Sequence, residues 1–180
     1  MNQIRYDGPV TIAVGESRRS TQWKNKEVLW SQLVERLSIP TKTPETVDEY
    51  TNAGGWKASK LRKVLNTEIL ALLPDDMRAA IKPRVIDGES DLLWLASEME
   101  VFGLHDWTEN DPDRGEQMAY YKRRGNRIKA LGDEGEAAGS WWERSPYASN
   151  ATFFCYVNSS GNAGSNGASY SFGVAFGFCV

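Results

Sequence analysis

Histidine and cysteine, on which many active sites depend, are scarce in this sequence, which contains one histidine, His105, and two cysteines, Cys155 and Cys179. A Ser-His-Asp or Cys-His site would have to use His105, and no nucleophile is marked near it. The glycine loops that bind phosphates, GxGxxG and GxxxxGK followed by Ser or Thr, are absent, as is the GxSxG turn. We therefore expect neither catalysis nor a cofactor.

Two cysteines are too few for a disulfide scaffold, and they lack the close spacing of a zinc site. Both occur in alternating apolar segments, which favours buried, reduced thiols over a redox or copper-binding pair. His105 is close in sequence to Asp106, Asp111 and Asp113, so a metal ligand or a general base is conceivable there. The spacing fits no EF-hand loop, and we interpret this stretch as a solvated acidic loop.

The sequence also lacks an excess of positive charge and any long apolar run. The 21 Lys and Arg are outnumbered by 24 Asp and Glu, whereas a protein that neutralises nucleic-acid phosphates needs a surplus of basic residues. No apolar run reaches the roughly 18 residues that span a bilayer, and residues 1–17 lack the basic-then-apolar order of a secretory signal. We expect a soluble protein made in the cytoplasm, with no nucleic-acid partner and no membrane insertion.

The length of 180 residues suits one compact domain with a sizeable core. Residues 10–14, rich in β-branched side chains, are typical of a strand, and apolar residues at helical spacing predict a helix over 23–37. Residues 39–55 carry two prolines and a glycine pair, which indicates a surface connection.

The next segments carry clear start and stop signals. Ser59 caps a predicted helix over 59–72, and Pro74 opens a short helix that ends at Ile81. Residues 91–96 are predicted to form a buried strand. The capping box of Ser97 and Glu100 then begins a short helix, which Gly103 closes, and residues 105–139 should form loops around short elements.

The last part of the chain has no charge at all. Residues 147–180 contain no Asp, Glu, Lys or Arg, but they hold eight aromatic residues, six serines, five glycines and four asparagines. We predict strands over 152–157, 168–172 and 173–180, with turns over 158–167. Because helices come first and strands last, the fold class is α+β.

These residue types are the ones that antigen-combining surfaces favour, since aromatic rings supply rigid contact area and Ser, Gly and Asn supply adaptable hydrogen bonds. We assign to the core Phe154, Val157, Val174, Phe176 and Phe178. We assign to an exposed surface the aromatic residues that punctuate small polar ones, namely Tyr147, Phe153, Tyr156, Tyr170 and Phe172.

Four motifs carry a resemblance to a known family. They are GWKASKLRKVLN over 55–66, LWLASEMEVFG over 93–103, GEQMAYYKRRGNRIK over 115–129, and GSWWERSP, which leads into the uncharged segment. Together they make residues 54–180 resemble the target proteins of diversity-generating retroelements, which occur in phages and prophages. Each motif alone would be weak, but the combination is specific.

The resemblance implies a C-type lectin fold of the subclass shared with formylglycine-generating enzymes, with mixed or antiparallel strands toward the C-terminus. It places a lectin-like domain at 54–180 with a variable region at 141–180, and leaves 1–53 as a strand, helix and linker packed on the domain or leading into it. It also implies that adenine-directed copying rewrites asparagine codons, which can never become Lys, Glu, Gln, Met or Trp. Residues 147–180 contain none of these five types.

The family pattern also divides the residues of the variable region into two sets. The positions expected to vary and to bind ligand are Tyr147, Asn150, Phe153, Tyr156, Asn158, Ser159, Ser160, Asn162, Gly164, Ser165, Asn166, Gly167, Tyr170 and Phe172. The expected invariant frame is Trp141, Trp142, Arg144, Phe154, Cys155, Val157, Gly173, Val174, Phe176 and Phe178. The catalytic cysteines of the enzyme relatives have no counterparts in Cys155 and Cys179, so oxidase activity is not implied.

The resulting hypothesis is a ligand-binding protein that displays a hypervariable face to a protein or glycan on a host cell surface. A homo-oligomer and incorporation into a phage virion are compatible with it. Two alternatives stay open: a structural virion subunit that uses the uncharged face for oligomerisation, and an enzyme, either of the formylglycine-generating type or a metal-dependent one that uses His105.

Overall fold

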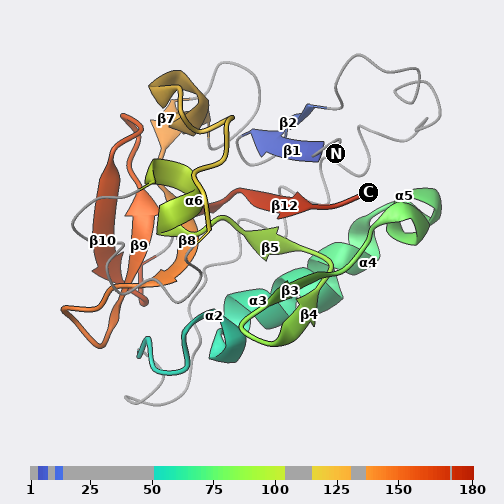
Figure 1. The fold of residues 1–180 in the computed structure, drawn as a ribbon, viewed down its shortest axis with the longest axis horizontal. Helices are drawn as coiled ribbons and strands as arrows, with labels where there is room; N and C mark the ends of the chain where they lie inside the picture. Colours follow the sequence, from blue (N-terminus) through green and yellow to red (C-terminus); the bar gives the residue numbers. More distant parts are fainter. Residues whose placement is uncertain (1–3, 8–10, 14–50, 104–114, 131–136, 171) are drawn as a thin grey trace.

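The structure, a computed structural model, describes residues 4–7, 11–13, 51–103, 115–130, 137–170 and 172–180, and only the backbone of the first two ranges. Helices and strands are mixed along the chain, so the predicted α+β class is confirmed at this level (Figure 1). The helix predicted over 23–37 and the acidic stretch around His105 lie outside the described residues. None of the helices described has the length and apolar character needed to cross a membrane.

The predicted helix over 59–72 is present, but it is less regular than expected. It comprises α3 (Lys60–Val64), a π-helical turn η2 (Leu65–Ile69) and α4 (Leu70–Leu72), and a separate helical turn, α2 (Gly55–Ala58), precedes the extended Ser59. Ser59 caps α3 as predicted, because its side chain accepts a hydrogen bond from the backbone N–H of Arg62 at 3.1 Å. Helix α5 (Asp75–Ala80) follows Pro74, with two aspartates in its first turn.

A hairpin that the sequence analysis missed joins β3 (Arg84–Ile86) to β4 (Glu89–Asp91). Its turn is Asp87-Gly88, with φ angles of 51° and 77°, the left-handed values that this residue pair adopts in a type I′ turn. Two charged side chains tie the hairpin to the helices, since the buried Asp91 accepts hydrogen bonds of 2.7 Å from Trp56 Nε1 and from Arg62 Nε.

The prediction of a continuous strand over 91–96 is wrong at residues 92 and 93. Residues 92 and 93 leave the strand because the side chain of Asn66 satisfies their main chain: its Oδ1 accepts from the N–H groups of Leu92 and Leu93 at 2.8 and 3.0 Å. Strand geometry resumes in β5 (Trp94–Leu95). The capping box of Ser97 and Glu100 then begins α6 (Glu98–Phe102), which ends at Gly103, both as predicted.

Short elements connect α6 to the terminal strands in the described part of this region. They are the 3-10 helix η4 (Arg124–Arg127) and the hairpin of β6 (Lys129–Ala130) with β7 (Ala138–Gly139). This agrees with the predicted loops around short elements.

The uncharged segment contributes to a sheet of order β10-β9-β8-β11. Its strands are β8 (Trp141–Pro146), β9 (Phe153–Val157), β10 (Ala163–Gly167) and β11 (Gly173–Val174). β9 confirms the strand predicted over 152–157. The strand predicted over 168–172 was wrong, and half of the predicted turn region is β10. Its sequence, AGSNG, has low β propensity and is extended because the preceding turn places it beside β9.

The second sheet, of order β2-β1-β12-β5, brings the two ends of the sequence together. β2 (Thr11–Ala13) falls within the strand predicted over 10–14, whereas β1 (Ile4–Asp7) was not predicted. β12 (Phe176–Phe178) pairs with both β1 and β5, and its two phenylalanines are buried as their alternation predicted.

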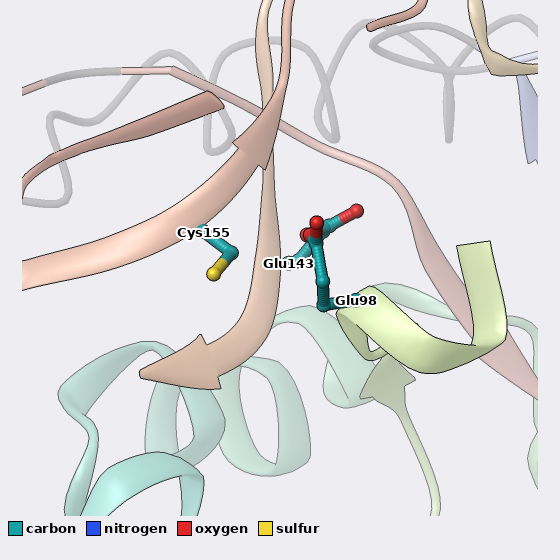
Figure 2. A group of neighbouring side chains, drawn as sticks. All are labelled: Glu98, Glu143 and Cys155. Carbon is teal, nitrogen blue, oxygen red and sulfur yellow. The ribbon is translucent and has the colours of Figure 1, made fainter. Parts of the chain in front are cut away.

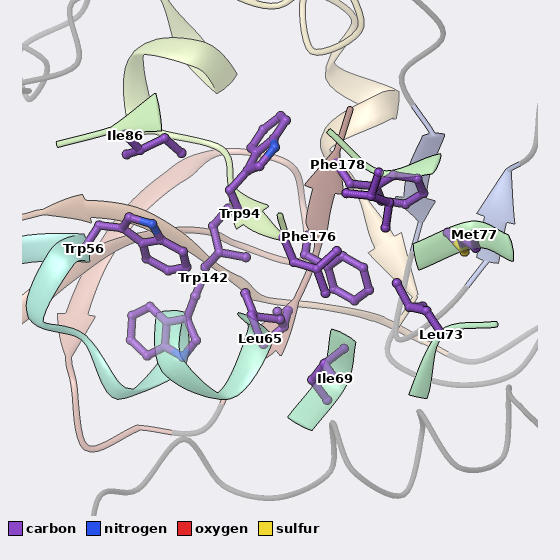
Figure 3. Packing of buried hydrophobic residues seen from close by; sticks show 14 residues of the cluster. Trp56, Leu65, Ile69, Leu73, Met77, Ile86, Trp94, Trp142, Phe176 and Phe178 are labelled. Carbon is purple, nitrogen blue, oxygen red and sulfur yellow. The ribbon is translucent and has the colours of Figure 1, made fainter. Parts of the chain in front are cut away.

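Two hydrophobic clusters lie on opposite faces of the sheet that contains β8. The larger cluster joins the helices to β5 and β12 and includes Trp56, Leu65, Ile69, Met77, Trp94, Trp142, Phe176 and Phe178 (Figure 3). The smaller cluster contains Ala96, Val101, Trp141, Val157 and Ala175. Both cysteines have free thiols; Cys155 is buried as expected, but Cys179 is only half-buried, because it follows the buried Phe178 in an alternating strand.

Candidate binding face

The face of the sheet that packs toward α2 and α3 holds several positions expected to vary. Strand register aligns Trp142, Tyr156 and Gly164 across β8, β9 and β10. Phe154 and Asn166 form the next pair on the same face, two residues further along. The opposite face carries Trp141 and Val157 into the smaller cluster.

Four rings meet at this face, and we call Trp142, Tyr156, Tyr170 and Phe172 the aromatic cluster. The ring of Phe172 lies 4.6 Å from those of both Trp142 and Tyr156, and 6.3 Å from that of Tyr170. Tyr170 is 56% exposed. Of the five aromatic residues assigned to an exposed surface, Tyr170 is exposed, whereas Tyr147, Phe153, Tyr156 and Phe172 are half-buried. Tyr156 and Phe172 pack against the larger hydrophobic cluster beside the buried Trp142, and Phe154, which was assigned to the core, is also half-buried there.

Tyr156 and Gly164 form a coupled pair, because a Cβ atom at Gly164 would lie 2.6 Å from Cε1 and Cζ of the Tyr156 ring. We expect Gly164→Val to lower the free energy of unfolding by about 1–3 kcal/mol when residue 156 is Tyr. In a Tyr156→Ser background, the same change should cost at most about 0.5 kcal/mol. Urea unfolding of both single variants and the double variant measures this coupling; equal costs in the two backgrounds would show that the ring simply moves aside.

Asn52 holds the loop between β8 and β9 through its main chain. The Asn52 side-chain nitrogen donates to the carbonyl oxygens of Tyr147, Asn150 and Phe153 at 3.0, 2.9 and 2.8 Å, so its two N–H groups are shared among three acceptors. The backbone N–H of Asn52 donates to the carbonyl of Ala151 at 2.7 Å. Because each of these contacts is to a carbonyl, the anchoring by Asn52 does not depend on which side chains occupy 147, 150 and 153. The loop also has an internal contact, since Asn150 Oδ1 accepts from the N–H and the hydroxyl of Thr152 at 3.0 and 2.8 Å.

The turn between β9 and β10 is held in a comparable way. Arg124 Nε donates to the carbonyl oxygen of Ser160 at 2.9 Å. Within the turn, Asn158 Oδ1 accepts from the N–H groups of Ser160 and Asn162 at 2.9 and 3.0 Å, and Gly161 adopts a φ of 76°. Here one expected variable side chain, Asn158, itself shapes the turn, as Asn150 does in the first loop.

The structure places the predicted ligand-binding positions at both ends of β9, in the loop before it and the turn after it, and on β9, β10 and the residues that follow β10, with differing exposure. Asn150, Ser159, Ser160, Asn162 and Tyr170 are exposed. The half-buried positions are Tyr147, Phe153, Tyr156, Asn158, Gly164, Ser165, Asn166 and Phe172. Gly167 is buried, which corrects its assignment to the surface: its backbone N–H and carbonyl are both used in the turn that follows β10.

An ion pair behind the face fixes β8 to α6. Arg144 Nη1 donates to Glu100 Oε2 and, at 2.7 Å, to the carbonyl of Leu95, while Arg84 pairs with Glu100 Oε1. Glu100 and Arg144 are both buried. Burial alone would raise the pKa of Glu100, but the charges and hydrogen bonds of Arg144 and Arg84 outweigh it, so the pKa is lowered.

A cavity of about 1030 Å³ opens between the helical run and the sheet. Its floor includes Trp142 and Phe154, and its helical wall carries Lys57, Lys60 and Lys63. The cavity therefore brings solvent to the edge of the larger hydrophobic cluster, and three lysines line its helical wall.

Three buried side chains could act as metal ligands on the other side of β8. Glu98 from α6, Glu143 from β8 and Cys155 from β9 bring two carboxylates and a thiol within 4.8 Å of one another (Figure 2). Carboxylate oxygen and thiolate sulfur are donors that Zn²⁺ accepts. The sequence analysis assigned Cys155 to packing and did not single out either glutamate, since they are distant in sequence from each other.

The residues that sequence reasoning missed are those that hold the loops. Asn52 lies in the predicted linker, and Arg124 lies in a motif that contributed only to the resemblance. Neither position carries a local signal, because a side chain that binds distant carbonyls leaves no periodic pattern.

A family described as a domain of unknown function (DUF6273) matches residues 24–180 of the chain. No curated protein and no solved structure gives a significant match.

Proposed function

The chain belongs to the DUF6273 family of domains of unknown function, and from this premise we propose that it is a ligand-binding protein with a C-type lectin fold, whose C-terminal surface is diversified by a retroelement. Its activity is binding without catalysis. The ligand is a protein or glycan on a host cell surface, and the protein acts as part of a phage or prophage system.

One observation carries this proposal: the loop of residues 147–153 is held by Asn52 through carbonyl oxygens alone. This anchor is kept whatever side chains occupy 147, 150 and 153, as repeated codon replacement requires, and the hydrogen bonds of Asn150 Oδ1 to Thr152 are the part of the loop that a replacement at 150 would remove. The exposed ring of Tyr170 and the exposed amide of Asn150 supply rigid contact area and adaptable hydrogen bonds at this end of β9, and the exposed side chains of 159, 160 and 162 supply hydrogen-bonding groups at its other end.

Sequencing the DNA beside the gene tests the proposal. We expect a reverse transcriptase gene and a near-copy of the 3′ end of this gene that differs only at adenines, with the differing codons falling on the predicted variable positions. Codons for Trp142, Arg144 and Phe176 should be identical in the two copies. Absence of both elements would contradict diversification and favour a structural virion subunit.

A further inference from the structure

The outer edge of β10 has main-chain hydrogen-bonding groups that no other described residue uses, and we propose that this edge binds an extended segment of a partner protein as an added strand. β10 is the terminal strand of the order β10-β9-β8-β11. The inference rests on the proposed function, because it names polypeptide as the class of ligand that the diversified face takes.

The direction of each main-chain group in β10 follows from two hydrogen bonds at the ends of its ladder with β9. The N–H of Asn158 donates to the carbonyl of Asn162, and that of Ala168 to the carbonyl of Thr152, both at 2.8 Å. Hydrogen-bonded pairs in an antiparallel ladder recur at every second residue. The main chain of residues 164 and 166 therefore faces β9, and that of residues 163, 165 and 167 faces outward.

Gly167 uses its outward groups locally. Its N–H donates to Asn166 Oδ1 at 2.8 Å, and its carbonyl accepts from the N–H of Tyr170 at 3.0 Å. Among the outward-facing residues, Ala163 and Ser165 therefore have N–H and carbonyl groups that no other described residue uses. They are two residues apart, which is the spacing between hydrogen-bonded pairs in an antiparallel ladder, so both could pair with an added antiparallel strand.

Natural sheets block such edges with lysine, proline, a bulge or an inward-pointing charge. Residues 163–167 contain no charged residue and no proline, and their register with β9 is unbroken over the whole strand. An edge without any of these features is suited to strand addition.

Several features favour a segment of another protein over a second copy of this chain. Pairing through the main chain of only two residues buries little area, whereas a stable dimer buries at least about 1,000 Å², so this edge is better suited to a short peptide segment than to a second copy of the chain. An added strand would lie next to Gly164 and the aromatic cluster, so that alternate side chains of the ligand meet Tyr156 and Tyr170. Main-chain bonds would then supply an affinity common to all variants, and varied side chains would supply specificity.

The test uses random decapeptides displayed on filamentous phage, selected on the full chain, with the selected peptides then made synthetically. Ala163→Pro removes an outward N–H without breaking the ladder to β9, and Ala163→Ser, which keeps that N–H, is its matched control. We expect the proline variant to bind the peptides at least about tenfold more weakly and the serine variant to bind within about threefold of the parent, with thermal unfolding unchanged in both. If Ala163→Pro does not fold, Ser165→Pro tests the same edge.

Three results would overturn the inference: no peptide is selected, the proline and serine variants bind equally, or sedimentation shows a dimer of the parent that Ala163→Pro dissociates. Tyr170→Ala separates this failure from that of the proposed function. If Tyr170→Ala abolishes peptide or glycan binding while Ala163→Pro leaves it intact, the face binds through side chains, and the proposed function stands without strand addition.

Discussion

Glu100→Gln is expected to lower the free energy of unfolding by about 3–5 kcal/mol, because it removes the carboxylate charge that pairs with the buried guanidinium of Arg144. The change also weakens the capping box at Ser97, whose N–H donates to Glu100 Oε2 at 2.9 Å. Urea unfolding at pH 7 measures the loss. Glu116→Gln, at an exposed position, is the matched control and should cost at most about 0.5 kcal/mol.

The same variant should alter the dependence of stability on pH. The folded-state pKa of Glu100 lies below its unfolded value of about 4.3, so its contribution is complete above that value and is lost as pH falls through the folded pKa. The parent should therefore lose stability on acidification more steeply than Glu100→Gln does. Parallel curves for the two proteins, or a loss at pH 7 no larger than that of the control, would show that the ion pair contributes little.

Asn52→Ala is expected to release the 147–153 loop and to lower the free energy of unfolding by about 2–3 kcal/mol, since three carbonyl oxygens lose their shared donor. Amide hydrogen exchange should show faster exchange at Tyr147 and Phe153, whose N–H groups are bonded within the loop. Thr51→Val removes two exposed hydroxyl bonds, one donated to the carbonyl of Ala151 at 3.2 Å and one accepted from the N–H of Ala53 at 3.0 Å, and should cost less than about 1 kcal/mol.

The outcome of Asn52→Ala separates two roles of this side chain. Loss of loop protection while the amides of β9 and β10 stay protected would show that Asn52 positions the loop. Unchanged exchange at residues 147–153 would mean that the internal turns, including the bond from Phe153 N–H to the carbonyl of Asn150 at 3.1 Å, are sufficient. In that case the anchoring by Asn52 would not be what keeps the path of the loop when its side chains are replaced.

Local signals in the sequence predicted local structure well. Ser59, Pro74 and the Ser97–Glu100 box mark helix ends correctly because caps depend on neighbouring residues alone. The Asp87-Gly88 turn was equally readable and was overlooked. The strand over 91–96 failed for a different reason, since the interruption comes from Asn66, which is far away in sequence.

The candidate site was predictable in its residue types and less so in its geometry. The absence of charge over 147–180 indicated a surface with unusual chemistry, and Tyr170 is exposed as expected. The inward tilt of Tyr156 and Phe172 depends on Trp142, and the placement of β10 depends on a hairpin between residues of weak β propensity. Both are tertiary effects that override local preference.

Under the proposed diversification, the position of β12 would make folding depend on the reading frame of the recopied codons. This strand lies between β1 and β5 and buries Phe176 and Phe178 in the larger hydrophobic cluster, and every position expected to vary precedes it. A frameshift or premature stop introduced while those codons are recopied would remove the central strand of the second sheet, leaving a core that cannot close. Only chains copied in frame to β12 would fold, and misfolded products would be left to cellular proteases.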